Sequence, residues 1–299
     1  MSLTINRNCL RRHFLDSTLP LTNNNDGTPP DGKPMPKLAA NLSMMFNEVD
    51  FMTRFRVAAE AGFKGVEYLF PYDYPAENIL AELGKYGLAQ VLHNLPAGDW
   101  DAGERGIACL PDRVNEFQDG LIQGIEYATA LGCTQINCLA GIRPGSVDHD
   151  TAHDTLVNNL RFAAEELQKA NISLLIEAIN TRDIPGFYVT TTDQAKLIIN
   201  NVGSQNLRLQ YDIYHMQIME GDLIPTIEQN LDLIQHIQLA DNPGRNEPGT
   251  GEINYPNVLS AIDSMGYNGW IGCEYKPQTT TIDGLVWASP YLGQVNHDN

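Results

Sequence analysis

Basic residues are scarce in this chain. Its 299 residues include 19 lysines and arginines against 37 aspartates and glutamates, so the formal net charge is −18 at pH 7. Such a surface repels phosphate backbones, which argues against a nucleic-acid partner, but it does not repel metal cations. Long hydrophobic runs are also absent, because no apolar stretch approaches the roughly 18–20 residues that a membrane span needs. We therefore expect a soluble protein without a nucleic-acid or membrane partner.

Cysteine is scarce as well, and the cysteines do not cluster. The five residues are Cys9, Cys109, Cys133, Cys138 and Cys273. Their number is odd, and three of them lie in or beside apolar runs. This pattern indicates the reduced thiols of a cytoplasmic protein and argues against a disulfide framework or a zinc site.

The first 36 residues lack the apolar pattern of a folded core. Residues 23–32 consist of Asn, Asp, Gly, Thr and Pro, a composition that predicts disorder. Ahead of them, three arginines and a histidine precede the first acidic residue, Asp16. An organelle transit peptide has this bias, and an uninformative leader or a misplaced start codon explains it as well. We divide the chain into a disordered leader or extension, residues 1–36, and one domain, residues 37–299.

From residue 37 onward a short apolar strand, a polar loop and an amphipathic helix repeat along the chain. Strands are predicted at residues 38–42, 65–69, 89–93, 135–139, 173–177, 207–212, 234–239 and 270–274. Helices are predicted at residues 51–61, 76–86, 111–131, 152–170, 192–200, 223–231, 255–265 and 282–288. Eight such units in about 260 residues predict an α/β fold of the (β/α)₈ TIM-barrel type. The competing doubly wound sheet usually has a glycine-rich turn after its first strand, and residues 41–46 contain no glycine.

The fifth predicted strand ends on a carboxylate, Glu177. Removing a carboxylate from water costs several kcal/mol unless a positive group meets it. Glu177 therefore lies either at a solvated rim or beside a cation.

Other polar residues stand at the carboxyl ends of the predicted strands, where TIM barrels have their active sites. They are Glu67, His93, Asp212, Gln238 and Glu274, with His215 just beyond the sixth strand. Glu177, Asp212, Gln238 and Glu274 follow one another at spacings of 35, 26 and 36 residues, about one unit each. A single acid at such a place is usually a solvated rim group or a helix cap, but four oxygen ligands on consecutive strands favour a metal site. Ligands of this kind suit Mg²⁺ or Mn²⁺ better than zinc.

Two histidines are further candidates for contact with a substrate. His93 and His215 stand at or near strand ends, where a histidine is as often a hydrogen-bonded structural group as a ligand or an acid. His215 follows Asp212 by three residues, a spacing that can aim it at a substrate held by the metal.

Two arginines in loops supply positive charge to an otherwise acidic protein. Arg245 lies in a loop rich in proline and glycine, and Arg105 lies in a loop with glycine on either side. The planar guanidinium group suits a carboxylate or a keto acid. The alternative is a surface role, in which Arg245 pairs with Glu247 or Glu252.

Several segments together resemble the hydroxypyruvate isomerase family of xylose-isomerase-like barrels, over about residues 36–292. They are GFKGVEYLFPY (62–72), NLPAGDW (94–100) with GERG (103–106), IEAIN (176–180), YDIYH (211–215), the loop 236–254 and GCEYKP (272–277). The resemblance implies that Glu177, Asp212, Gln238 and Glu274 bind a divalent cation and that Glu177 and Glu274 transfer the proton. The leader before Pro36 departs from the family, which usually begins near the first strand.

The implied activity is an intramolecular oxidoreduction that interconverts hydroxypyruvate and 2-hydroxy-3-oxopropanoate (tartronate semialdehyde), or a related short 2-oxo sugar acid. A proton leaves one carbon and returns to its neighbour, and the enediolate between them carries charge that Mg²⁺ or Mn²⁺ can clamp. Two carboxylates on opposite sides can serve as base and acid.

Other functions stay open at this point. A ketose 3-epimerase of the same superfamily usually has a histidine where Gln238 stands. A zinc phosphodiesterase would need more histidines and a basic face. A non-catalytic protein that binds a sugar acid through the metal belongs to another class, which solvent exchange into the substrate would distinguish.

Overall fold

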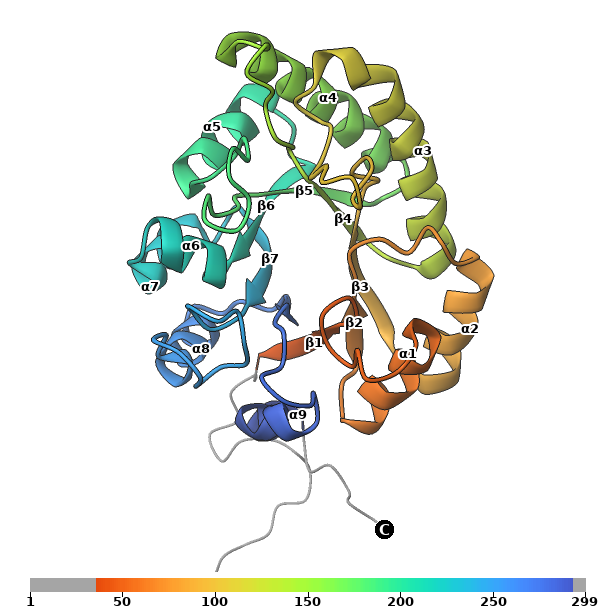
Figure 1. Cartoon of the computed structure of the whole chain (residues 1–299), viewed down its shortest axis with the longest axis vertical. Coiled ribbons are helices and arrows are strands. Elements are labelled where there is room, and N and C mark those ends of the chain that lie inside the picture. The colour runs from red at the N-terminus through yellow and green to blue at the C-terminus, as the bar shows by residue number, and fades with distance from the viewer. Residues whose placement is uncertain (1–35, 293–299) are drawn as a thin grey trace, which may run out of the picture.

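The computed structural model describes residues 36–292 of the chain (Figure 1). The predicted leader up to residue 35 and Cys9 lie outside the described residues. Within them, eight parallel strands pair in sequence order and close into a barrel, because β1 pairs with both β2 and β8. The strands are β1 Lys37–Asn41, β2 Gly65–Glu67, β3 Ala89–Asn94, β4 Gln135–Cys138, β5 Ser173–Glu177, β6 Leu207–Asp212, β7 Ile234–Leu239 and β8 Trp270–Cys273. The predicted (β/α)₈ barrel is confirmed.

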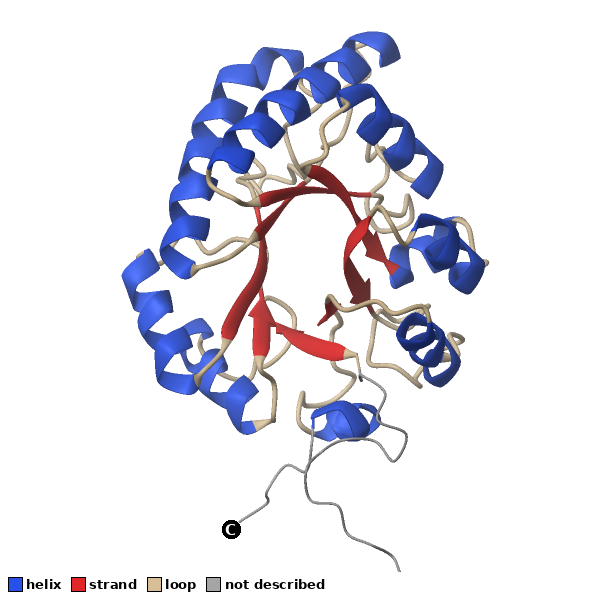
Figure 2. Ribbon diagram, turned by 180° about the vertical axis from the view of Figure 1, so that it is seen from behind, coloured by secondary structure: helices blue, strands red, loops and turns tan. Residues whose placement is uncertain are grey.

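Helices surround this barrel on its outside (Figure 2). The α-helices of the described residues are α1 Phe51–Glu60, α2 Ala76–Tyr86, α3 Val114–Leu131, α4 His149–Lys169, α5 Thr192–Val202, α6 Ile213–Met219, α7 Leu223–Asn230, α8 Tyr255–Ser264 and α9 Ser289–Leu292. Two 3₁₀ helices accompany them, η1 Pro111–Arg113 and η2 Asp283–Ala288. None of these helices is both long and apolar enough to cross a membrane.

Local signals in the sequence explain where the helices begin and end. The side chain of Asp148 accepts a hydrogen bond of 2.8 Å from the backbone N–H of Thr151 and so caps the start of α4. Helices α3 and α5 end at Gly132 and Gly203, whose φ angles of +67° and +71° lie in the region that favours glycine. These caps fix the residues at which the helices begin and end, and so the points at which the chain turns back toward the next strand.

One helix, α6, was not among the predicted elements. Helix α6 begins directly after β6, because Asp212 Oδ1 accepts hydrogen bonds from the backbone N–H groups of Tyr214 and His215. Its residues are mostly apolar and its first four are buried, so the segment lacks the alternation of polar and apolar faces that reveals a helix. The predicted helix at residues 282–288 is the 3₁₀ helix η2, followed by α9.

The barrel interior changes from apolar to polar along the strands. Ala39, Val91 and Leu175, from β1, β3 and β5, belong to a small apolar cluster. Farther along the strands the interior side chains are polar, and Glu67 and Gln238 are both buried there. The remaining four cysteines are free and buried, as the prediction of reduced thiols requires.

Candidate active site

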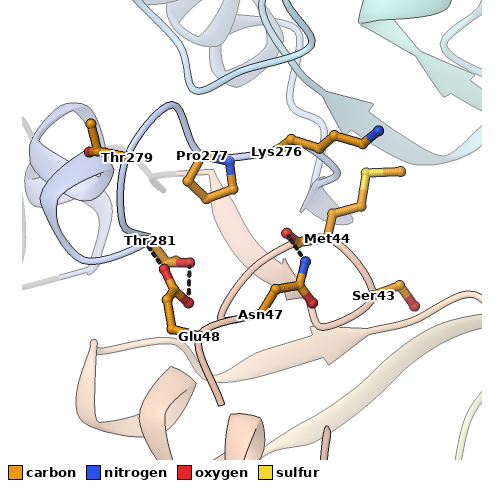
Figure 3. Close-up of a pocket in the computed structure, with 8 residues that line it drawn as sticks. All are labelled: Ser43, Met44, Asn47, Glu48, Lys276, Pro277, Thr279 and Thr281. Carbon is orange, nitrogen blue, oxygen red and sulfur yellow. Dashed lines mark hydrogen bonds between the residues drawn. The ribbon is translucent and has the colours of Figure 1, made fainter. Parts of the chain in front are cut away.

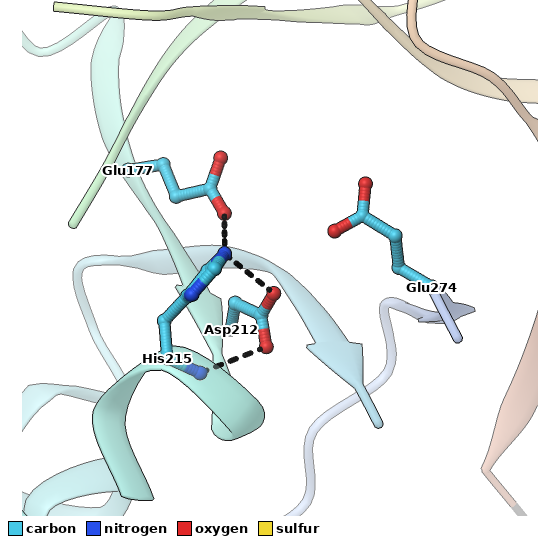
Figure 4. A group of neighbouring side chains, drawn as sticks. All are labelled: Glu177, Asp212, His215 and Glu274. Carbon is cyan, nitrogen blue, oxygen red and sulfur yellow. Dashed lines mark hydrogen bonds and ion pairs between the residues drawn. The ribbon is translucent and has the colours of Figure 1, made fainter. Parts of the chain in front are cut away.

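Three carboxylates and a histidine meet at the carboxyl end of the barrel (Figure 4). Glu177 ends β5, Asp212 ends β6, Glu274 directly follows β8, and His215 lies in the first turn of α6. One ligand atom from each of the four residues lies within 4.8 Å of the others, and all four residues are buried. Glu274 reaches toward the group from the side opposite Glu177. The structure thus brings together the acids that the strand spacing predicted to converge.

Gln238, the fourth predicted ligand, pairs with Asp212 in the register of β6 and β7. Its Oε1 accepts a hydrogen bond of 2.7 Å from Gln210 Nε2, and its Nε2 donates one of 2.8 Å to Glu67 Oε1. An amide oxygen has two lone pairs, so one lone pair of Gln238 Oε1 remains for a cation.

Burial and mutual repulsion dominate the electrostatics of this acidic group. Burial, together with Glu274 and Asp212, raises the pKa of Glu177 well above its usual range. Burial raises the pKa of Glu274 to about 8, although Arg245 opposes the shift. Burial also raises the pKa of Asp212, again against the effect of Arg245. The group therefore holds protons unless another positive charge compensates it.

The donor set fits a hard divalent cation. Asp212 Oδ2 is buried and has no hydrogen-bond partner, although a carboxylate oxygen in that state is costly. The neighbouring oxygens of Glu177 and Glu274 are close enough to share one ion with it. Several carboxylate oxygens and an amide oxygen are ligands that Mg²⁺ and Mn²⁺ accept.

Asn180, which the sequence left without a role, orients His215. Asn180 Nδ2 donates a hydrogen bond of 2.6 Å to His215 Nδ1. The other ring nitrogen, Nε2, lies 3.5 Å from Asp212 Oδ2 and 3.9 Å from Glu177 Oε1. Burial, together with Arg245, lowers the pKa of His215 well below its usual range, so the ring is neutral. Its hydrogen is therefore on Nε2, the nitrogen that faces the acids.

Arg245 lies inside the site, and its ion-pair partners are the site's acids. Its Nη2 is 2.7 Å from Glu274 Oε2 and 3.8 Å from Asp212 Oδ2, and its Nη1 is 3.8 Å from Asp183 Oδ2. The guanidinium also lies over the ring of Tyr214, 5.1 Å from its centroid. Burial lowers the pKa of Arg245, but the attraction of Glu274 and the other acids outweighs this and raises it overall.

The structure does not bring His93 to the site. The ring is fully buried against Tyr68 and Tyr72, at centroid distances of 6.5 and 6.1 Å. Consecutive strand residues point to opposite faces, and it is the next residue, Asn94, that lines the site cavity. Burial lowers the pKa of His93 to about 4, so the imidazole is neutral.

Arg105 does not line the cavity but contacts Trp100, which does. Its guanidinium lies over the ring of Trp100, 4.1 Å from the centroid, and donates hydrogen bonds to the carbonyl oxygens of Trp100 and Glu104. Trp100 itself lines the cavity. In this structure Arg105 therefore holds the loop that forms one wall of the cavity.

A cavity of about 80 Å³ opens beside the acids. Both polar and apolar side chains line it. The lining residues are Met44, Leu69, Asn94, Trp100, Leu139, Glu177, Ile179, Ile184, Gln210, His215, Arg245 and Glu274. A cavity needs at least about 10–15 Å³ to hold one water molecule, so this cavity has room for a few water molecules or a small ligand.

A second pocket, of about 390 Å³, adjoins the cavity across Met44 (Figure 3). It lies between the loops that follow β1 and β8. Its other lining residues are Ser43, Asn47, Glu48, Lys276, Pro277, Thr279 and Thr281. Met44 therefore lines both spaces.

Comparisons with known proteins agree with this geometry. The chain matches the family model for xylose isomerase-like TIM barrels over residues 55–290. The hydroxypyruvate isomerase of Escherichia coli (strain K12) is 57% identical over 257 residues, which cover 86% of this chain and 100% of that protein. A 2-oxo-tetronate isomerase of Cupriavidus necator is 45% identical over 260 residues, 87% of this chain and 100% of that protein. A crystal structure described as an AP endonuclease, family 2, from Brucella melitensis has a TM-score of 0.84 at 47% identity and covers 86% of this chain and 99% of that chain.

Proposed function

This chain belongs to the hydroxypyruvate isomerase family of xylose isomerase-like TIM barrels, and on that premise we propose that it interconverts hydroxypyruvate and 2-hydroxy-3-oxopropanoate, or a four-carbon 2-oxo acid of the same kind. It is an isomerase. One observation carries the proposal. The buried side chains of Glu177 and Glu274 reach toward each other from opposite sides, and both line one small cavity (Figure 4). We assign the activity to the single domain that begins at residue 37.

The two glutamates are placed for the proton transfer that the isomerisation requires. One carboxylate takes a proton from the hydroxymethyl carbon of hydroxypyruvate, and the other carboxyl group returns a proton to the neighbouring carbon. The hydroxyl proton passes to the former carbonyl oxygen, which balances the reaction. In the protein without a cation, burial raises the pKa of both carboxyl groups, so each of them can take up a proton more readily than an ordinary glutamate. Glu177 and Glu274 exchange roles in the reverse direction.

Glu177, Asp212, Gln238 and Glu274 would hold the divalent cation, magnesium or manganese, which supplies positive charge beside the two substrate oxygens that become negative. His215 presents an N–H at Nε2 and can donate it to one of these oxygens. Arg245 adds one positive charge and keeps the acids partly ionised. The apolar residues of the cavity lining limit the contact of the reacting carbons with water.

The size of the cavity favours a short substrate. Hydroxypyruvate is a three-carbon acid, and the cavity volume is about 80 Å³. A four-carbon 2-oxo acid would extend past Met44 toward the second pocket. Gln238 stands where the resemblance leads us to expect a histidine in ketose 3-epimerases, so the isomerase remains the better proposal.

The decisive experiment is a substrate panel of hydroxypyruvate, a four-carbon 2-oxo acid and free ketohexoses, run with and without a chelator in D₂O. We expect turnover of the 2-oxo acids, loss of turnover with the chelator, and deuterium at the substrate carbon that gains the proton. Glu177→Gln and Glu274→Gln should each lower turnover by at least about 100-fold. Near-normal turnover in both variants would rule out the proposed proton transfer, and binding without deuterium exchange would indicate a non-catalytic binder.

A further inference from the structure

Glu67 is a buried carboxylate next to the active site that the proposed proton transfer does not use. Its exposure is 0%. Its Oε1 accepts hydrogen bonds from Asn41 Nδ2, at 3.0 Å, and from Gln238 Nε2, at 2.8 Å. Its Oε2 lies 2.7 Å from His236 Nε2. Every one of these partners is buried too, so a carboxyl group lies deep in the barrel where an apolar side chain would be less costly.

The barrel leaves room for this carboxylate at a glycine. A Cβ atom on Gly272 would lie only 2.3 Å from both carboxylate oxygens of Glu67, closer than non-bonded atoms approach. Gly272 also pairs with Gln238 in the register of β7 and β8. The position beside Gln238 therefore lacks a side chain, and the Glu67 carboxylate occupies that space.

An ionised carboxylate only accepts hydrogen bonds, so it dictates which end of a neighbouring amide faces it. Glu67 requires the NH₂ end of Gln238, and this leaves the amide oxygen for the cation site. Gln210 cannot set this orientation alone, because its own Oε1 has no hydrogen-bond partner and the side chain is free to turn and present that oxygen. Among the described contacts of Gln238, Glu67 is the group that excludes the reversed amide.

Asn41 extends the effect of Glu67 to a second acid. Its Nδ2 donates to Glu67 Oε1 and, at 3.3 Å, to Glu274 Oε1. Its Oδ1 accepts the backbone N–H of Ser43 at 3.1 Å, which fixes the amide the same way round. Glu67 and Glu274 are thus joined through one NH₂ group.

We infer that Glu67 is a positioning residue of the cation site: it turns the amide oxygen of Gln238 toward the site and, through Asn41, holds the carboxylate of Glu274. This inference rests on the proposed function, in which Gln238 and Glu274 bind the cation. Groups that orient metal ligands in this way commonly change metal affinity by about 10–100-fold when they are replaced.

The test measures Mn²⁺ affinity and not turnover. Free Mn²⁺ is followed by electron paramagnetic resonance in titrations of the full chain, far below the unfolding temperature of each metal-free variant. Glu67→Gln removes the requirement for an NH₂ partner and should raise the Kd for Mn²⁺ at least about tenfold. Gly272→Ala keeps Glu67 but displaces its carboxylate, and it should raise the Kd in the same direction. If Glu67→Gln does not fold, the Kd of Gly272→Ala for Mn²⁺ tests the inference instead.

His236→Gln is the matched control. It alters the partner of the other Glu67 oxygen but leaves the contacts of Glu67 with Gln238 and Asn41 in place. We expect a lower unfolding temperature with a Kd within about threefold of the unaltered protein. The inference is overturned if Glu67→Gln and Gly272→Ala bind Mn²⁺ normally, or if His236→Gln weakens binding as much as they do. If the unaltered protein turns over substrate but binds no Mn²⁺, the proposed cation requirement fails, and the inference falls with it.

Discussion

Arg245 Nη2 lies 2.7 Å from Glu274 Oε2, so the guanidinium that lines the cavity is already bound to an acid of the site. Asp212 and Asp183 lie within 3.8 Å of the same guanidinium. The sequence suggested Arg245 as the group that binds an acidic substrate. In the structure its charge offsets that of the carboxylates, and the carboxylate of a 2-oxo acid therefore needs a further positive group.

Lys276 is placed to be that group. Among the described residues that line the cavity and the adjoining pocket, the cations are Arg245 and Lys276. Lys276 is exposed and follows Glu274 by two residues, and its side chain extends to the same side of the pocket as Met44 (Figure 3). We predict that Lys276→Met raises KM for 2-oxo acids by about five- to tenfold, the effect of roughly 1 kcal/mol at an exposed charge pair. Turnover at saturation should change little.

Lys64→Met is the control for this prediction, because Lys64 is exposed just before β2, at the opposite end of the barrel. Steady-state kinetics at two salt concentrations measure the effect, and salt should raise KM for the unaltered protein more than for Lys276→Met. Equal KM values for Lys276→Met and Lys64→Met would show that Lys276 does not bind the substrate.

Cation affinity should depend steeply on pH. Without a cation the pKa of Glu274 is about 8 and that of Glu177 is also raised, so these groups hold protons at neutral pH. A cation binds the ionised form and must displace the protons. Lowering the pH from 8 to 6 should therefore raise the apparent Kd for Mn²⁺ about tenfold per pH unit for each proton displaced.

Calorimetric titration in two buffers of different ionisation enthalpy measures this proton release directly. Glu274→Gln should release fewer protons and flatten the pH dependence. Binding that is independent of pH between 6 and 8 would contradict the raised pKa values. In the metal-free protein the same shifts have the opposite effect on folding, since a carboxyl whose pKa is raised on folding lowers stability as the pH rises toward its folded value.

The fold and the acids were predictable because their signals are local. Each strand is a short apolar run, and in a barrel the carboxyl ends of such runs meet, so Glu177, Asp212 and Glu274 could be placed by counting strands. Helix α6 was not predicted because its residues are mostly apolar and do not alternate between a polar and an apolar face.

The roles of the other site residues could not be predicted, because they depend on which way a side chain points and on contacts with residues far along the chain. A shift of one residue decides whether His93 or Asn94 faces the cavity, and strand spacing cannot resolve that shift. The roles of Glu67 and Asn180 follow from contacts with residues far along the chain, such as Gln238 and His215. A polar residue at or just beyond the end of a buried strand was the available signal, but solvated rim residues show the same signal.

Met44 should control the choice between three-carbon and four-carbon substrates. It lines both the cavity and the adjoining pocket. Met44→Ala joins the two spaces, so it should raise kcat/KM for a four-carbon 2-oxo acid relative to hydroxypyruvate by about tenfold. Leu139→Ala is the control, because Leu139 lines the cavity but not that pocket. If the two variants change the ratio equally, total volume and not the opening at Met44 sets the preference.

Asn180 should determine which nitrogen of His215 has the hydrogen. It donates to Nδ1 at 2.6 Å, and its own Oδ1 accepts the backbone N–H groups of Arg182 and Asp183. Asn180→Asp keeps those two backbone bonds but turns the donor into an acceptor, which moves the ring hydrogen to Nδ1. We expect turnover to fall at least about tenfold with little change in KM.

Asn180→Leu separates this effect from simple support of the loop. Leucine cannot accept the hydrogen bonds from the two backbone N–H groups, but it does not draw the ring hydrogen to Nδ1. If Asn180 acts by setting the tautomer of His215, Asn180→Leu should therefore keep more activity than Asn180→Asp. A purely structural role predicts the reverse order, because only the aspartate preserves the loop. Nitrogen-15 spectra of the labelled imidazole identify the protonated nitrogen in each variant. A hydrogen on Nε2 in Asn180→Asp would show that Asn180 does not set the tautomer of His215.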